Sequence, residues 1–346
     1  MNMKNICIML LWSGILIFSA CTSDTVIVPD SVVESPSTDG QTNGDKADRY
    51  TVVFEENEVF SDETAQKAAQ HIDLHIKQAV NLMNTVREDR YPFEALKCDY
   101  VSRKKARDSI TDPISLEMYD IMVQKAFAFE DCRFDSSFAQ GDLFNAVVTA
   151  NDAVRLDYPY LLLYSDMIIK GNTYILGYYL PGDWIDNLCD DREKVKNEVE
   201  LFDCIIERIT EKMPQNLTDW EKCMYFAFVI ASAVEYDNEM VTMGNSYQAY
   251  DALVKGKALC EGYALAFRYL CQQEDIACWY CLGEAPYDLG YHAWNIVETT
   301  DGPIYIDITW YDEEDITDSY RHGKTSYLFM TQEDYDYYGY SEKSRR

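Results

Sequence analysis

Three residues whose types together support nucleophilic acyl chemistry occur in the last third of the chain, in the order Cys260, His292 and Asp307. A thiol attacks an acyl carbon as the thiolate, and it therefore needs a base within reach. Histidine suits this role because its ordinary pKa lies near neutral pH. A carboxylate beside the histidine fixes the tautomer of the ring and stabilises the imidazolium. These residues predict acyl transfer through a thioester.

Cys260 is expected in the first turn of a helix, because apolar residues recur at helical spacing in the segment that it opens, CEGYALAFRYLC, residues 260–271. The unused N–H groups and the positive dipole end of a helix start favour a thiolate. The same N–H groups can stabilise an oxyanion. A cysteine on an apolar helix is, taken alone, most often a core residue. The prediction therefore depends on finding it together with His292 and Asp307.

His292 and Asp307 lie on two segments that we expect to pair as strands, residues 291–298 and 303–310, joined by the hairpin signal TTDG. In the second strand, Asp307 should share a face with Tyr305 and Thr309, because side chains alternate along a strand. A loop of even length places His292 and Asp307 on one face, about 5–8 Å apart at Cβ. A three-residue loop places them on opposite faces. The pairing is thus a geometric prediction.

The rest of the chain contains the patterns that must position these residues. The capping-box pair Thr218 and Glu221 marks the start of a helix. Apolar periodicity predicts further helices over residues 64–87, 114–130, 141–153 and 190–213, and aromatic strand-like pieces over 158–167 and 172–181. Helices followed by strands are typical of an α+β protein. We place a boundary near residue 214, between a mainly helical N-terminal region, 51–214, and a catalytic domain, 215–346.

The N-terminus has the order of residues of an exported protein. A short basic start, an apolar run and small residues precede Cys21, and polarity rises directly after it. We expect residues 1–20 to be a lipoprotein signal peptide, with Cys21 lipidated and the protein anchored in the bacterial cell envelope. Ordinary secretion with cleavage near Ala20 is the alternative. Residues 21–50, rich in Ser, Thr, Asp and Gly, are expected to form a flexible tether.

Composition excludes some partners. The formal net charge of −30 opposes binding to nucleic acid and electrostatic attachment to anionic lipid. No residue pattern completes a metal site, since His71 and His75 lie four apart on a helix without a third ligand. We predict no metal and no cofactor. The chain has eleven cysteines. Cys7 lies in the predicted signal peptide and Cys21 is expected to carry lipid, so nine remain. Because nine is odd, at least one thiol stays unpaired within the chain.

Cys278 and Cys281 form a C-x-x-C pair in a segment that we interpret as a strand. Residues three apart on a strand point to opposite faces, which is unfavourable for a redox pair or a zinc site. We expect buried thiols here, or one disulfide with Cys271. The pairing among Cys98, Cys132, Cys189, Cys204, Cys223, Cys271, Cys278 and Cys281 is left open.

The segments GKALCEGYALAFRYL, YHAWNIV and IYIDITW resemble the three signature segments of the transglutaminase-like superfamily. The resemblance covers roughly residues 216–332 and includes all three positions of the site. It implies a papain-related fold, in which a cysteine-bearing helix packs on an antiparallel sheet that carries His292 and Asp307. It also implies transglutaminase, protease or amidase activity, and no metal. The segment SYQAYDAL is similar to the region before the nucleophile, and it offers Gln248 or Tyr247 as an oxyanion donor.

Three functions remain open at the level of sequence. The first is a lipid-anchored cysteine protease or amidase that hydrolyses peptide or protein amides. The second is a transglutaminase that passes the acyl group to an amine, and the choice depends on how well the site excludes water. The third is a binding module for a peptide or glycan on the same fold, suggested by the Tyr-rich N-terminal region.

Overall fold

The structure is a computed structural model of the chain, and it describes residues 50–52, 54, 63–85, 105–130, 132–135, 143–158, 167–170, 173–176, 192–238, 248–284, 290–313 and 327–345. These residues form a mixed, α+β fold. The predicted signal, the tether with Cys21, and Tyr247, Cys98 and Cys189 lie outside the described residues. No helix in the described ranges is long and apolar enough to cross a membrane.

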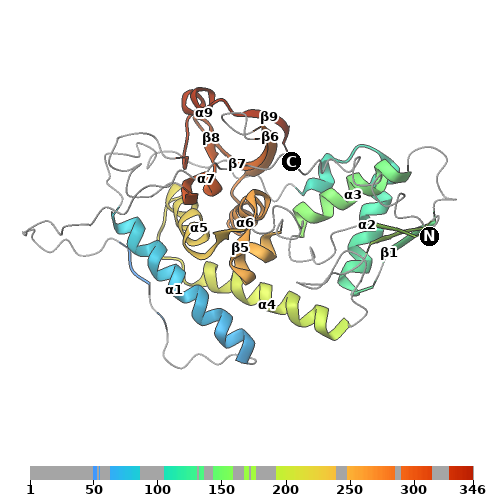
Figure 1. Cartoon of the computed structure of the whole chain (residues 1–346), viewed down its shortest axis with the longest axis horizontal. Coiled ribbons are helices and arrows are strands. Elements are labelled where there is room, and N and C mark those ends of the chain that lie inside the picture. Colours follow the sequence, from blue (N-terminus) through green and yellow to red (C-terminus); the bar gives the residue numbers. More distant parts are fainter. Residues whose placement is uncertain are drawn as a thin grey trace, which may run out of the picture.

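Helix α5 (Asp219–Ala233) is the centre of the helical layer; α1 (Glu63–Thr85) packs along it, and α4 (Arg192–Glu211) packs on α1. Figure 1 shows α1 and α4 along the lower edge, the main sheet at the top, and α5 between them. The predicted capping box at the start of α5 is confirmed, with hydrogen bonds in both directions between Thr218 and Glu221. Because α5 is covered on all sides, nearly every residue along it is buried.

A smaller unit lies to one side, in green in Figure 1. It contains a 3-10 turn, η2 (Ala106–Ser109), the helices α2 (Pro113–Phe127) and α3 (Leu143–Asp157), and the strands β1 (Cys132–Asp135), β2 (Met167–Lys170) and β3 (Thr173–Leu176). The three strands form an antiparallel sheet in the order β1-β3-β2. Strand β3 lies within the predicted piece 172–181, whereas β2 overlaps the predicted piece 158–167 only at residue 167, and β1 was not predicted.

The main sheet is antiparallel, with its four strands in the order β8-β7-β6-β9. These strands are β6 (Cys278–Glu284), β7 (Tyr291–Thr299), β8 (Gly302–Ile306) and β9 (Ser341–Arg345). Helix α6 (Cys260–Gln273) packs against β6 and β7 and also contacts α5. A short parallel pair, β4 (Glu235–Tyr236) and β5 (Lys257–Ala258), and the short π-helix η6 (Asp251–Lys255) precede α6.

The chain after β8 continues into α7 (Ile308–Glu313) and later into α9 (Gln332–Tyr338), which packs on β8. It then adds β9 to the opposite edge of the sheet, beside β6. Strand β7 is buried almost throughout, from His292 to Val297, because α6 contacts it and aromatic residues of the C-terminal segment pack on Trp294.

One prediction about the second strand was wrong. Residues 303–310 were expected to form a single strand, but β8 ends at Ile306 and α7 begins at Ile308. Asp307 caps the new helix, because its Oδ1 atom accepts a hydrogen bond from the N–H of Trp310 and its carbonyl accepts one from Tyr311. Such local bonds compete with the strand ladder. Thr309 therefore lies on a helix and shares no strand face with Asp307.

Candidate active site

Cys260 is the first residue of α6, as predicted, and it is half-buried. Leu259 before it is extended, and its carbonyl accepts hydrogen bonds from the N–H groups of Gly262 and Tyr263, at 2.9 and 3.3 Å. The helix thus begins with the N–H groups of Cys260 and Glu261 unused by its own ladder. A sulfur at this point lies at the positive end of the helix dipole.

The hairpin between β7 and β8 has the register that the site requires. Thr299 pairs with Gly302, so the loop contains two residues, and the predicted even-length loop is confirmed. The ladder continues to the pair Asn295–Ile306. One step further along this register, Asp307 lies opposite Trp294 and diagonal to His292. Nε2 of His292 and Oδ2 of Asp307 are 2.7 Å apart, a hydrogen bond between buried groups.

His292 joins the two other residues, because its ring also shares a hydrogen bond with the side chain of Cys260. Since Nε2 binds Asp307, Nδ1 is the nitrogen left for the sulfur. Burial lowers the pKa of His292, but the charge of Asp307, its hydrogen bond and the contact with Cys260 together outweigh burial and raise the pKa to about 10. His292 is therefore an imidazolium at neutral pH, which stabilises a thiolate beside it.

Asp307 is fully buried, with 0% of its surface exposed, and it accepts three hydrogen bonds. Oδ2 accepts from His292 at 2.7 Å and from the hydroxyl of Tyr340 at 2.6 Å, and Oδ1 accepts from the N–H of Trp310 at 3.1 Å. A buried carboxylate is tolerated where donors of this kind surround it. Sequence analysis did not find Tyr340, since no motif or spacing connects a residue 33 positions downstream to Asp307.

Two tryptophans enclose the imidazole. Trp310, half-buried, meets the ring of His292 edge to face with centroids 6.0 Å apart, and Trp294 lies 6.2 Å away at 26°. Apolar rings at these positions keep water away from the bond between His292 and Asp307. An ion pair is stronger in such a low-dielectric environment.

Asn295 ties the cysteine helix to the sheet. Its Nδ2 atom donates to the carbonyl of Ala264 on α6 at 3.0 Å and to the carbonyl of Trp279 on β6 at 3.2 Å. The residue is on the same strand as His292 and is 1% exposed. One side chain thus connects the helix that begins at Cys260 with the strand that carries His292. This role could not be found from the motif alone.

Replacing Asn295 with alanine is expected to lower the free energy of unfolding by about 2–4 kcal/mol, because the buried carbonyl of Ala264 and the partly buried carbonyl of Trp279 each lose a donor. Chemical denaturation near neutral pH measures this change. The control is Gln273→Ala at the end of α6, where the amide makes only a 3.4 Å bond within its own helix. It should change stability by less than about 0.5 kcal/mol. Equal effects of the two substitutions would contradict the role of Asn295.

The smaller unit contacts the beginning and the middle of α6. Arg155 on α3 forms an ion pair with Glu261, the neighbour of Cys260, at 3.9 Å. Arg268, in the middle of α6 and 5% exposed, donates to the carbonyl of Leu156 in the last turn of α3. A cation at a helix C-terminus is favourable. Helix α3 of the predicted N-terminal region therefore lies beside the helix that carries Cys260.

Of the two predicted oxyanion donors, only Gln248 lies in a described range. Its backbone N–H donates to Asp251 at 3.1 Å, and its carbonyl accepts from Ala252, which places it just before η6. Among the described contacts, its side-chain amide has no hydrogen bond with Cys260 or His292. Tyr247 lies outside the described residues. The N–H groups of Cys260 and Glu261 lie at the start of α6, beside the sulfur's own residue.

The other cysteines form no disulfide where the structure describes them. Cys271 hydrogen-bonds with Cys223 and Cys278, and burial raises the pKa of Cys271 well above its ordinary value. Cys281, also buried, has its pKa raised by the same cause. The C-x-x-C pair thus consists of buried thiols, the first of the two expected arrangements. Buried thiols of this kind react slowly.

The two histidines whose spacing resembles that of metal ligands, His71 and His75, contact each other through their rings. His71 and His75 meet edge to face with centroids 4.4 Å apart. Within the described ranges, no group of three or more His, Cys, Asp or Glu side chains could hold a metal ion.

Comparison with known proteins adds one distant likeness. No family model matches the chain, and no curated protein matches it. A solved structure, described as that of a "putative cysteine protease" from Cytophaga hutchinsonii, is 18% identical over 40% of this chain, with a TM-score of 0.26. The match spans about half, 51%, of that chain. This similarity is too weak to carry an argument, and the geometry of Cys260, His292 and Asp307 is therefore the basis for assigning a function.

Proposed function

We propose that the chain is a cysteine acyl-transfer enzyme of the transglutaminase-like type, with Cys260 as nucleophile, His292 as acid and base, and Asp307 as the orienting carboxylate. One observation carries the proposal: Nε2 of His292 lies 2.7 Å from Oδ2 of Asp307 while the same ring hydrogen-bonds with Cys260. The sulfur also lies at a helix start. Nucleophile, base and orienting group are thus linked in the order that the chemistry needs.

The first half-reaction forms a thioester. The thiolate of Cys260 attacks the carbonyl carbon of an amide, a carbon–sulfur bond forms, and the π electrons move to the oxygen. In this proposal the N–H groups of Cys260 and Glu261, at the start of α6, stabilise the oxyanion. When the oxyanion collapses, the carbon–nitrogen bond breaks and His292 gives its Nδ1 proton to the departing amine.

The second half-reaction restores the enzyme. A water molecule attacks the thioester while the now neutral His292 takes its proton, and the carbon–sulfur bond breaks. The products are a carboxylic acid, the thiolate and the imidazolium. An amine in place of water gives a new amide by the same steps. We propose hydrolysis of peptide or protein amides as the main reaction, because Cys260 is half-buried and its residue is therefore partly exposed to water.

The experiment offers peptide and protein amides to the full chain, with and without a labelled primary amine, and identifies products and trapped thioester by mass spectrometry. Free carboxylic acid that depends on Cys260 supports hydrolysis. Amine-labelled product supports transfer to an amine instead. Binding of a peptide or glycan without turnover, unchanged in Cys260→Ala, would identify a binding module and contradict the enzyme proposal.

We also propose that the mature protein is attached to the bacterial cell envelope through lipid on Cys21. The support is the order of charge, apolar run and small residues before Cys21. Metabolic labelling with a radioactive fatty acid should mark the wild-type protein and leave Cys21→Ala unlabelled. Equal labelling of both proteins would contradict this anchor.

A further inference from the structure

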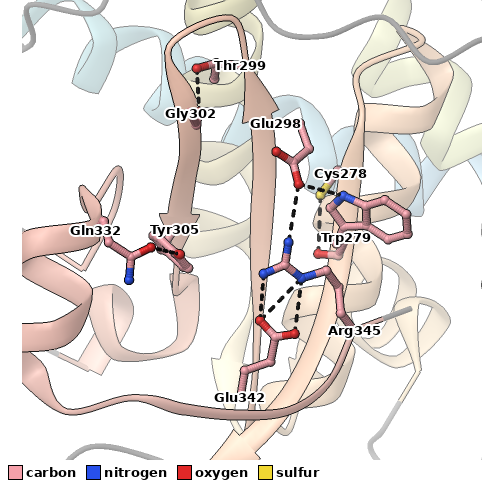
Figure 2. Close-up of polar contacts among 9 residues, drawn as sticks. All are labelled: Cys278, Trp279, Glu298, Thr299, Gly302, Tyr305, Gln332, Glu342 and Arg345. Carbon is pink, nitrogen blue, oxygen red and sulfur yellow. Dashed lines mark hydrogen bonds and ion pairs between the residues drawn. The ribbon is translucent and has the colours of Figure 1, made fainter.

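The last part of the described chain, residues 331–345, passes over the main sheet, and we name it the C-terminal strap. At its beginning, Gln332 accepts a hydrogen bond from the hydroxyl of Tyr305 on β8. At its end, Arg345 bonds to Glu298 on β7, at 3.3 Å, and to Glu342 within the strap. Figure 2 shows the contact of Gln332 with Tyr305 at the left and the contacts of Arg345 with Glu298 and Glu342 at the right, with the strap running from one to the other. Both ends of the strap are therefore fixed.

Tyr340 lies between these attachments and is 7% exposed. Its ring stacks on Tyr335, with centroids 5.0 Å apart and planes at 12°, and meets Trp294 at 5.1 Å. Its hydroxyl donates to Oδ2 of Asp307 at 2.6 Å. This is the oxygen that also binds Nε2 of His292. Packing thus orients a single hydroxyl towards the carboxylate of the site.

The strap approaches the sheet closely at Gly283 on β6, which pairs with His292 on one side and with Glu342 on the other. A Cβ atom on Gly283 would lie 2.1 Å from the carbonyl oxygen of Ser341 and 2.6 Å from the ring of Trp294. No side chain larger than hydrogen fits there without a shift of the backbone. The absence of a side chain at Gly283 therefore lets the residue after Tyr340 reach its observed position.

We propose that Tyr340 is a positioning residue of the site, which acts by holding the carboxylate of Asp307 in the orientation that His292 requires. This inference rests on the proposed function. Trp310 holds Oδ1, and His292 and Tyr340 hold Oδ2, so the carboxylate group is restrained at both oxygens. His292 becomes neutral once it has protonated the departing amine, and its attraction to Asp307 then weakens. The hydroxyl of Tyr340 keeps Oδ2 in place during that interval.

The hydroxyl of Tyr340 keeps its proton at neutral pH and remains a hydrogen-bond donor, because burial and the adjacent charge of Asp307 raise its pKa well above the ordinary value. Replacing it with phenylalanine removes the hydroxyl and leaves the ring. We expect Tyr340→Phe to lower kcat about 10-fold, the cost of one hydrogen bond to a charged group, with KM changed less than about 2-fold. A substrate-binding defect would instead raise KM.

Tyr335 supplies a matched control, since it is buried, stacks on the same ring and makes no hydrogen bond through its hydroxyl within the described ranges. Tyr335→Phe should leave kcat within about 2-fold of wild type. A loss in Tyr335→Phe as large as in Tyr340→Phe would show that ring packing alone explains the effect, and it would overturn the proposal.

Proton NMR supplies a readout that does not need turnover. The Nε2 proton of His292 should give a strongly downfield signal, and the chain has only four histidines to assign. With Tyr340→Phe, Oδ2 has one donor fewer and binds His292 more strongly, so this signal should move further downfield. In Tyr335→Phe it should stay in place. An unchanged signal in Tyr340→Phe, with unchanged kcat, would overturn the proposal.

The two proposals fail in different ways. If wild type cleaves no amide but the signal shifts in Tyr340→Phe alone, the proposed function fails while the contact of Tyr340 with the site stands. If wild type is active and Tyr340→Phe is equally active, only the positioning role fails.

Discussion

Substitution of Cys260 by alanine is expected to reduce amide turnover by at least about 10³-fold, because no thioester forms without the sulfur. Alanine is the best helix former and suits the first position of α6. The half-buried site also loses little packing, so the free energy of unfolding should change by less than about 1 kcal/mol. Turnover and chemical denaturation of the same preparation measure the two effects.

Thiol labelling tests the same residue without a substrate. At about pH 6 an ordinary thiol is largely protonated and reacts slowly, whereas a thiolate held by an imidazolium reacts with iodoacetamide. Peptide mapping should show Cys260 labelled first. Cys204 on α4, also a half-buried thiol outside any disulfide, is the comparison, and Cys204→Ala should not change the labelling. If Cys260→Ala leaves the labelling of the protein unchanged, the proposed thiolate does not exist.

Asp307→Asn should have the next largest effect, a fall in kcat of about 10²- to 10⁴-fold. The carboxylate accepts bonds at both oxygens, from His292 and Tyr340 at Oδ2 and from Trp310 at Oδ1. An amide accepts at one end only, so either orientation of the introduced side chain sets its NH₂ group against a donor. His292 also loses the negative charge that keeps its pKa high. Steady-state kinetics and labelling of Cys260 at about pH 6 should both decline.

The stability of Asp307→Asn should depend on pH in a defined direction. The pKa of His292 in the folded protein, about 10, lies above its ordinary value of 6.5. Protonated His292 therefore contributes stability that is fully present below 6.5 and is lost as the pH rises through 10. The difference in unfolding free energy between wild type and variant should be larger at pH 6.5 than near pH 10, as followed by denaturant titration.

The control for this variant is Asp301→Asn, an exposed aspartate in the hairpin loop. It makes the same change of charge within a few residues of Asp307, but it should leave kcat, labelling and the pH profile unchanged. A difference between Asp307→Asn and wild type that does not vary with pH would contradict the assigned interaction with His292.

The amino-acid sequence by itself determined the features that depend on local periodicity. The helix start at Cys260 followed from spacing within one segment, and the capping box at Thr218 from two residues three apart. Because strand side chains alternate with a period of two, the sequence required an even-length loop if His292 and Asp307 were to share a face, and the structure supplied a loop of two residues. Each of these patterns lies within a short stretch of chain, and the backbone geometry of that stretch decides its meaning.

Only the tertiary structure decided the features that join distant segments. The end of β8 at Ile306 depends on Asp307 capping α7, which outcompetes the strand pattern of the isoleucines. Tyr340 reaches Asp307 because the C-terminal strap passes over the sheet at Gly283. Asn295 meets Ala264 because α6 packs on β7. Such contacts have no period along the chain. They form when burial of apolar surface brings separate elements together, and only the folded packing specifies which polar groups then meet.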